Sequence, residues 1–140
     1  MTMWQIVALF AASVSPEPGA GRIYEGVAYG PRQTMVCDWF SNFENSRFDR
    51  CRTSDGMIVP MEDGASLSCV PKLCSILEAR ARRVARWTRA DPVWGRFIVR
   101  LSGRVSTGSR PKRYLGDGTR SVLIERLIDV RRLDASFPSR

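Results

Sequence analysis

The sequence predicts a mainly β protein with one helix, an α+β chain, and three observations lead to this fold class. Residues 93–105 alternate strictly between apolar and polar side chains, as a half-buried strand does. Residues 75–89 show helical periodicity instead. The other apolar segments are short, rich in β-branched and aromatic residues, and separated by turn formers. Because the 140 residues contain no internal repeat or linker, one domain is expected over residues 21–140.

The N-terminal residues 1–20 differ from the rest because Glu17 is their only charged side chain. The apolar run Trp4–Val14 is shorter than the ~20 residues of a membrane span and fits the ~7–15-residue hydrophobic region of a signal peptide. Residues 1–20 are therefore expected to be a signal peptide, cleaved after Ser13 or Ala20. The start lacks the usual Lys or Arg, which leaves a buried N-terminal strand or helix as the alternative.

Between this leader and the helix, the sequence predicts extended segments separated by turns. Gly30 and Pro31 end the first of them, and Pro60 ends the last, which is expected to be an edge strand. The predicted segments are residues 22–30, 33–40, 47–52 and 57–59.

The second and third of these segments are expected to pair as a hairpin centred on Glu44, because residues 41–46 are turn formers. This register opposes an aromatic pair, an opposite-charge pair and a cysteine pair, and that agreement favours it. The predicted pairs are Phe40 with Phe48, Asp38 with Arg50, and Cys37 with Cys51.

Four cysteines, Cys37, Cys51, Cys69 and Cys74, favour a disulfide framework outside the cytosol. Of the three possible connectivities, the hairpin register favours Cys37–Cys51, which leaves Cys69–Cys74 to close a short loop. Intervals of 14, 18 and 5 residues without any histidine disfavour a zinc site, so no metal is expected. Buried free thiols are the alternative if the N-terminus is not a signal peptide.

The helix is expected over Ser75–Arg89. Ser75 and Glu78 match the S-x-x-E capping box, in which each side chain accepts a hydrogen bond from a free backbone N–H. Asp91-Pro92 stops the helix, because the residue before proline disfavours the helical conformation.

Two long strands are expected after the helix, joined by a loop over residues 106–119. In Val93–Val105 the odd positions are expected in the core and the even positions in solvent. The last strand is expected over Arg120–Leu133, with Val122, Ile124, Ile128 and Val130 on one face and Leu123 and Leu127 on the other.

This order of elements matches a small OB-like Greek-key β-barrel, in which five strands close and a helix lies between the third and fourth strands. Gly95 and Gly103 supply the bending that a small barrel requires in its long strands.

Two stretches resemble small exported bacterial proteins of unassigned function. Phe43–Cys51 is similar to their Phe-Glu-x-Ser-x-Phe-x-x-Cys pattern, and Arg96–Arg104 to a late strand of the Arg-Phe-x-Val-Arg-Leu-x-Gly-Arg kind. Because these proteins look OB-like, the resemblance implies a fold and export but no activity. It also implies an alternative to the hairpin, in which Phe43–Cys51 forms one continuous strand.

Few residues are candidates for catalysis. The absence of histidine excludes Ser-His and Cys-His mechanisms. The neighbouring carboxylates Glu62 and Asp63 are expected to point apart on a turn, and Asp117 is explained by its turn-forming glycines. No phosphate-binding glycine motif is present. The chain is therefore expected not to be an enzyme and to use no cofactor.

A basic loop near the C-terminus is the stronger functional candidate. In an OB barrel, the loop between the last two strands lies at the ligand-binding face. Guanidinium groups pair with phosphate or carboxylate, and a tyrosine stacks on a base or sugar. A solvated loop whose charge aids solubility is the alternative. The predicted ligand-binding residues are Arg104, Arg110, Lys112, Arg113, Tyr114 and Arg120.

The formal net charge of +8 points to anionic partners. The expected function is that of a periplasmic or secreted, disulfide-stabilised, non-catalytic binding or structural module without a transmembrane span. Its basic face would meet a polyanion or anionic surface, lipid or glycan, or a partner protein. The alternative is a cytosolic OB-fold nucleic-acid-binding protein, because phosphate neutralisation dominates such binding. A small inhibitor of an exported enzyme also fits the size, without a motif behind it.

Overall fold

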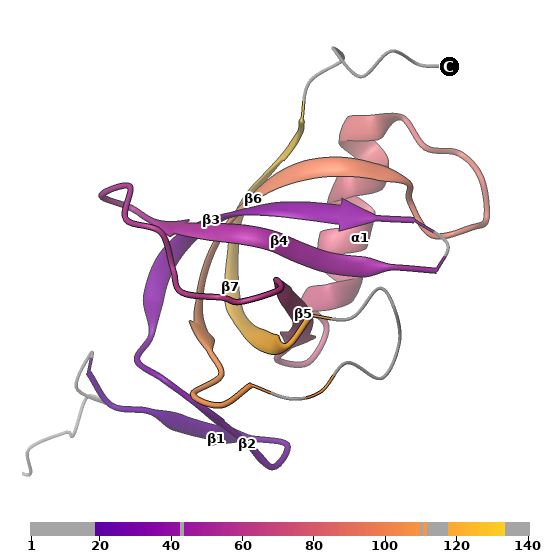
Figure 1. The fold of residues 1–140 in the computed structure, drawn as a ribbon. Coiled ribbons are helices and arrows are strands. Elements are labelled where there is room, and N and C mark those ends of the chain that lie inside the picture. The colour runs from indigo at the N-terminus through magenta and orange to yellow at the C-terminus, as the bar shows by residue number, and fades with distance from the viewer. Residues whose placement is uncertain (1–18, 43, 110, 112–117, 134–140) are drawn as a thin grey trace, which may run out of the picture.

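The computed structural model describes residues 19–42, 44–109, 111 and 118–133 (Figure 1). Residues 1–18, which hold most of the predicted signal peptide, lie outside this range. The described chain is mostly β with a single helix, as the sequence predicts. Its elements are β1 (Arg22–Tyr24), β2 (Val27–Tyr29), β3 (Gln33–Ser41), β4 (Ser46–Thr53), β5 (Ala65–Cys69), α1 (Leu73–Ala85), β6 (Gly95–Val105) and β7 (Arg120–Arg132).

Five strands form one sheet whose hydrogen-bonded ladders run in a closed ring. The order is β3-β4-β5-β7-β6, and β6 pairs again with β3. Every ladder is antiparallel except that of β5 with β7, which is parallel. The helix α1 follows β5 in the chain and packs against β7 and β5. In Figure 1, α1 and the β1–β2 hairpin lie on different sides of this ring.

The β3–β4 register confirms two of the three predicted pairs. Cys37 lies opposite Cys51 and Asp38 opposite Arg50, but the predicted pairing of Phe40 with Phe48 is wrong. A β-bulge at Asp49 inserts one residue, so Phe48 moves to the inner side and pairs with Trp39. Burial is the reason, because without the bulge Phe48 would share the outer side with Arg50.

The turn between β3 and β4 contradicts the alternative of one continuous strand from residue 43 to residue 51. The Oδ1 of Asn42 accepts hydrogen bonds from the backbone N–H groups of Glu44 and Asn45, at 2.8 and 2.6 Å. The Asn42 N–H in turn donates to the Asn45 carbonyl, at 2.8 Å. The chain therefore reverses here, and β4 begins only at Ser46.

Both predicted disulfides are present. Cys37–Cys51 links β3 to β4, with both cysteines fully buried, and Cys69–Cys74 links the end of β5 to the first turn of α1. No free cysteine is left. Two disulfides indicate an oxidising location outside the cytosol. Within the described residues, no helix is long and apolar enough to cross a membrane.

The core lies inside the ring and under the helix. It confirms the predicted inward side of Val93, Phe97, Val99 and Leu101, which are all fully buried. The prediction is wrong for Arg104, an even position expected in solvent, which is buried under the β1–β2 hairpin. The strand itself begins at Gly95, two residues later than predicted. From the other elements the core receives chiefly Met35, Trp39, Phe48, Leu77, Ala81, Val122, Ile124 and Val130.

The last strand follows the predicted span but not the predicted facing of its residues. Two register shifts against β6 leave Glu125 and Ile128 unpaired as bulges. Each bulge exchanges the two sides of the strand. Leu127, predicted on the face opposite Val122, therefore joins the core, whereas Ile128 is 40% exposed.

The helix differs from its prediction at both ends. It begins at Leu73, and Lys72 at the N-cap makes no side-chain capping bond, so the predicted Ser75–Glu78 capping box is wrong. Glu78 instead accepts a hydrogen bond from the backbone N–H of Val93, at 2.6 Å. The helix ends at Ala85 because Arg86 adopts a left-handed conformation with φ 53°.

Two extended segments also differ from their predictions. Residues 22–30 form the β1–β2 hairpin around Glu25 and Gly26, both at positive φ, instead of one strand. Residues 57–59 contribute only an isolated bridge, between Ile58 and Arg52. The strand that fills this place in the ring is β5, which the sequence analysis did not predict.

Candidate anion-binding surfaces

The structure describes two of the six predicted ligand-binding residues. Arg110, Lys112, Arg113 and Tyr114 lie outside the described residues. The remaining two, Arg104 on β6 and Arg120 at the start of β7, flank the basic loop.

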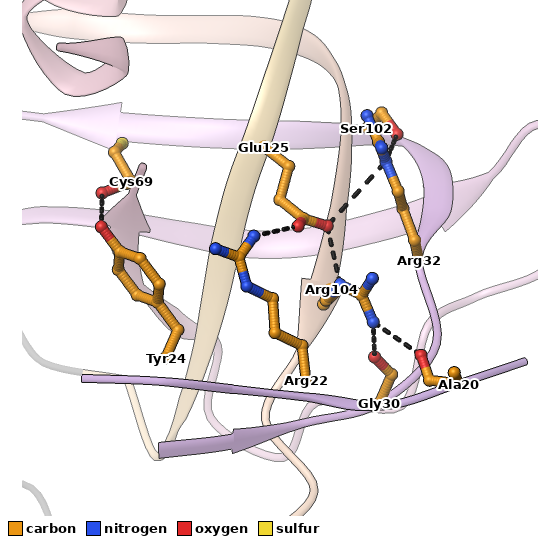
Figure 2. Close-up of polar contacts among 9 residues, drawn as sticks. All are labelled: Ala20, Arg22, Tyr24, Gly30, Arg32, Cys69, Ser102, Arg104 and Glu125. Atoms are coloured by element: carbon orange, nitrogen blue, oxygen red, sulfur yellow. Dashed lines mark hydrogen bonds and ion pairs between the residues drawn. The ribbon is translucent and has the colours of Figure 1, made fainter. Parts of the chain in front are cut away.

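Arg104 is buried and its guanidinium is engaged within the protein (Figure 2). Its Nε donates to Glu125 Oε1 at 2.7 Å, and both side chains are only 8% exposed. Its Nη1 donates to the carbonyls of Ala20 and Gly30, at 2.7 and 3.2 Å. Arg104 therefore fastens the β1–β2 hairpin to the ring, and an external ligand would have to displace these contacts.

Glu125 is surrounded by three guanidinium groups (Figure 2). Besides Arg104, Arg22 lies 2.5 Å and Arg32 3.9 Å from its carboxylate oxygens. Burial by itself would raise the pKa of Glu125, but the hydrogen bonds and charges of Arg104 and Arg22 outweigh it and hold the pKa below its ordinary value. The carboxylate thus remains the counter-ion of this cluster, which is structural.

Arg120 lines a cavity of about 560 Å³ whose described walls are the β1–β2 hairpin, β5, the start of β7 and residues 106, 108, 111 and 118 of the basic loop. Its Nη2 pairs with Glu62 at 3.0 Å, and its Nη1 donates to the Ser106 carbonyl at 3.1 Å. Its Nε is buried and has no hydrogen-bond partner among the described residues. Of the described predicted residues, Arg120 is therefore the one next to a space that a ligand could enter.

A second basic surface lies on the outer side of β4, β3, β6 and β7, which are consecutive in the ring (Figure 1). Along these strands, the residues that form this surface alternate with core residues. We call this surface the arginine face. Three acids interrupt it, Asp38, Asp49 and Asp129, and the arginines are Arg47, Arg50, Arg52, Arg96, Arg100, Arg126 and Arg131.

One end of the arginine face is aromatic. Phe40 lies between Arg47 and Arg96, whose guanidinium carbons are 5.1 and 5.2 Å from the centre of its ring. Asp49 pairs with both arginines, at 2.8 and 3.3 Å. The bulge at Asp49 therefore serves the surface as well as the core, because it places this carboxylate between two cations.

The charge of the arginine face is unbalanced. Its acids are engaged locally, as Asp38 pairs with Arg50 at 3.0 Å and Asp129 with Arg131 at 3.0 Å. Arg52 and Arg100 are exposed and have no ion pair within the described residues. Both lie opposite Val36 in register, one on each side of β3.

Sequence reasoning missed the arginine face although part of the signal was present. The even positions of residues 93–105 place Arg96 and Arg100 on one side of a strand. The sequence predicts that β4 pairs with β3 but does not reveal that β6 pairs with the other side of β3, which is what joins these arginines to Arg50 and Arg52.

Comparisons with protein-family models, with curated proteins and with solved structures find no match to this chain. Within the described residues, no group of three or more His, Cys, Asp or Glu side chains is placed to hold a metal ion.

Proposed function

We propose that this protein is an exported, non-catalytic binding module that uses the arginine face to hold an anionic polymer or surface. The observation that carries the proposal is the charge excess of that face, seven arginines against three aspartates, with Arg52 and Arg100 exposed and unpaired among the described residues. Guanidinium groups bind phosphate, sulfate and carboxylate in a bidentate manner.

The spacing of the cations supports a polymeric ligand. Arg52 and Arg100 are two strands apart in the sheet, with Val36 between them. Because neighbouring strands are about 4.8 Å apart, their backbones are separated by roughly 10 Å. Long, mobile side chains at that separation suit a chain of repeated negative charges better than one small anion.

The architecture supports an OB-like Greek-key barrel as the scaffold. The ladders close in the order β3-β4-β5-β7-β6, and among the strands of this ring α1 falls between the third and the fourth. OB-folds are five-stranded and bind extended ligands on an outer sheet surface.

Export to the periplasm or beyond the cell is supported by two features. Both disulfides stabilise a domain with a small core, as is usual in oxidising compartments. The low-charge leader of residues 1–20 has the composition of a signal peptide.

The test compares two charge-matched double variants on a heparin column, with elution by NaCl. Arg52→Gln with Arg100→Gln removes two cations from the arginine face. Arg83→Gln with Arg86→Gln removes two exposed cations from the helix side. We expect the first variant to elute at markedly lower salt than wild type, with a weaker salt dependence of binding, and the second to elute close to wild type.

Three other results would contradict this assignment. Equal losses in both variants would mean that net charge alone drives retention. Loss only on changing Arg110, Lys112 and Arg113 to Ser would place the site in the basic loop. Tighter binding of a single-stranded oligonucleotide than of heparin at equal salt would favour a nucleic-acid-binding protein.

A further inference from the structure

The two disulfides differ in how far solvent can reach them. Cys37 and Cys51 are fully buried and lie opposite each other on β3 and β4. Cys74, by contrast, is exposed at the start of α1, and its partner Cys69, the last residue of β5, is partly exposed. An external thiol must reach a sulfur atom of a disulfide to open the bond. The folded protein therefore presents Cys69–Cys74 to such a thiol and shields Cys37–Cys51 from it.

The loop that Cys69–Cys74 closes contains a strained residue. The backbone N–H of Leu73 donates to the Val70 carbonyl at 3.1 Å, which closes a β-turn inside this loop. Lys72, the third residue of the turn, has φ 74° and ψ −16°, close to the values of a type II turn. Glycine or asparagine usually fills that position, because a residue such as lysine is strained at positive φ. The closed loop therefore holds Lys72 in a conformation that the open loop does not require.

The first turn of α1 suits a negative charge on Cys74. Cys74 is the second residue of this helix, where the first backbone N–H groups lack partners inside the helix. Within the described chain, the N-cap Lys72 makes no side-chain capping bond, and the residues of the first turn are not acidic. A thiolate on Cys74 is therefore stabilised by the positive end of the helix, which makes Cys74 the better leaving group of the pair.

We propose that Cys69–Cys74 is a thiol-exchange site activated by its strained loop, whereas Cys37–Cys51 is a structural cross-link. One thiolate of an external dithiol attacks Sγ of Cys69, the S–S bond breaks, and Cys74 leaves as a thiolate. The second thiol of the dithiol then attacks its own sulfur partner in the mixed disulfide, which releases Cys69 and the oxidised reagent. Two electrons pass from the dithiol to the protein, and its two thiol protons end on Cys69 and Cys74. The partner is therefore a dithiol reductant.

Opening this bond loosens one joint of the fold and leaves the core in place. The disulfide links the end of β5 to the first turn of α1, whereas Leu77 and Ala81 hold the helix in the core. The Cys69 carbonyl also accepts a hydrogen bond from the hydroxyl of Tyr24 at 3.2 Å, which docks the β1–β2 hairpin on the same residue (Figure 2). Reduction is therefore expected to free the first turn of α1 without unfolding the ring.

Graded reduction of the folded, oxidised protein tests this proposal. The protein is incubated with dithiothreitol in the absence of denaturant, quenched with excess N-ethylmaleimide, and analysed by intact mass and peptide mapping. We expect the first species to carry two maleimide groups, on Cys69 and Cys74, while Cys37–Cys51 stays closed and the far-UV circular dichroism stays close to that of the oxidised protein. Opening of both disulfides together would overturn the proposal, as would earlier opening of Cys37–Cys51 or failure of Cys69–Cys74 to open without denaturant.

Two variants at the exposed Lys72 test the part played by the strained loop. Lys72→Gly removes the strain at positive φ, whereas Lys72→Gln removes the same charge and keeps the strain. In buffers of reduced and oxidised dithiothreitol, the equilibrium constant for reduction of Cys69–Cys74 should fall about fivefold in Lys72→Gly, because the closed loop is no longer strained. It should stay close to wild type in Lys72→Gln. Equal constants in the two variants would contradict activation by the loop.

Discussion

Glu125 is an acid that stays charged although its side chain is only 8% exposed, because three arginines surround it. Arg104, itself buried, depends on this carboxylate as its counter-ion. A buried charge that loses its partner destabilises a protein more than the pair stabilises it. The Arg104–Glu125 pair is therefore the polar contact on which the docking of the β1–β2 hairpin most depends.

We expect Glu125→Gln to lower the free energy of unfolding at pH 7 by about 3 kcal/mol, because Arg104 is left as an uncompensated buried cation. Urea denaturation measures this. Glu62→Gln is the matched control: Glu62 also pairs with an arginine, but its side chain is 59% exposed, so the loss should stay below about 1 kcal/mol. Equal effects of the two changes would contradict the structural role of Glu125.

The loss of stability in the Glu125→Gln variant depends on pH. The pKa of Glu125 is lowered in the folded protein, so its stabilising effect is complete above the unfolded-state pKa of about 4.5. That effect is lost as the pH falls through the lower folded-state pKa. The difference in stability between wild type and Glu125→Gln should therefore be constant near neutrality and shrink below about pH 4.

At the scale of elements, the helix shows how a local motif loses to tertiary packing. Ser75 and Glu78 have the spacing of a capping box, yet the disulfide partner Cys74 already lies inside the helix. The chain enters α1 through a left-handed Lys72, and Glu78 is used by the segment that follows the helix.

Two single substitutions distinguish the capping box from the observed contact. We expect Glu78→Ala to cost about 1–3 kcal/mol, because the buried backbone N–H of Val93 loses its acceptor. Ser75→Ala should change stability by less than about 0.5 kcal/mol, because this serine is exposed and is not a cap. Thermal or urea unfolding measures both. A loss of about 1 kcal/mol with Ser75→Ala would restore the capping box.

Among the strands, too, some follow from local sequence and others depend on tertiary contacts. Residues 93–105 are predictable because their alternation is strong, and the pairing of Cys37 with Cys51 follows from the turn and the side chains around it. The strand β5 is not predictable from its sequence, since Ala-Ser-Leu-Ser-Cys has little β propensity. It is a strand because β4 and β7 supply hydrogen-bond partners on its two sides.

At the scale of the whole molecule, two disulfides cross-link neighbouring elements, β3 with β4 and β5 with α1. Cys37 and Cys51 are 14 positions apart in the chain, and their disulfide lies inside the ring. Cys69 and Cys74 are 5 positions apart, and their disulfide fixes the helix to β5. Both favour a compartment in which thiols are oxidised.

Intact-mass measurement of the natively isolated protein tests this location. We expect a chain that lacks at least residues 1–13 and that takes up four alkyl groups only after reduction. The same protein expressed without residues 1–20 in a reducing cytosol is the control, and there the thiols should be alkylated directly. A full-length native chain with four reactive thiols would exclude export and favour the cytosolic alternative.

The sequence by itself determined the class of the fold, the main alternating strand, the existence of the helix and the pairing of the cysteines. These depend on periodicity and on neighbours a few residues apart. Only the tertiary structure decided the bulges at Asp49, Glu125 and Ile128, the burial of Arg104 and the assembly of the arginine face. The physical reason is that the side a residue takes in a closed sheet depends on strands distant in the chain, and one inserted residue reverses it.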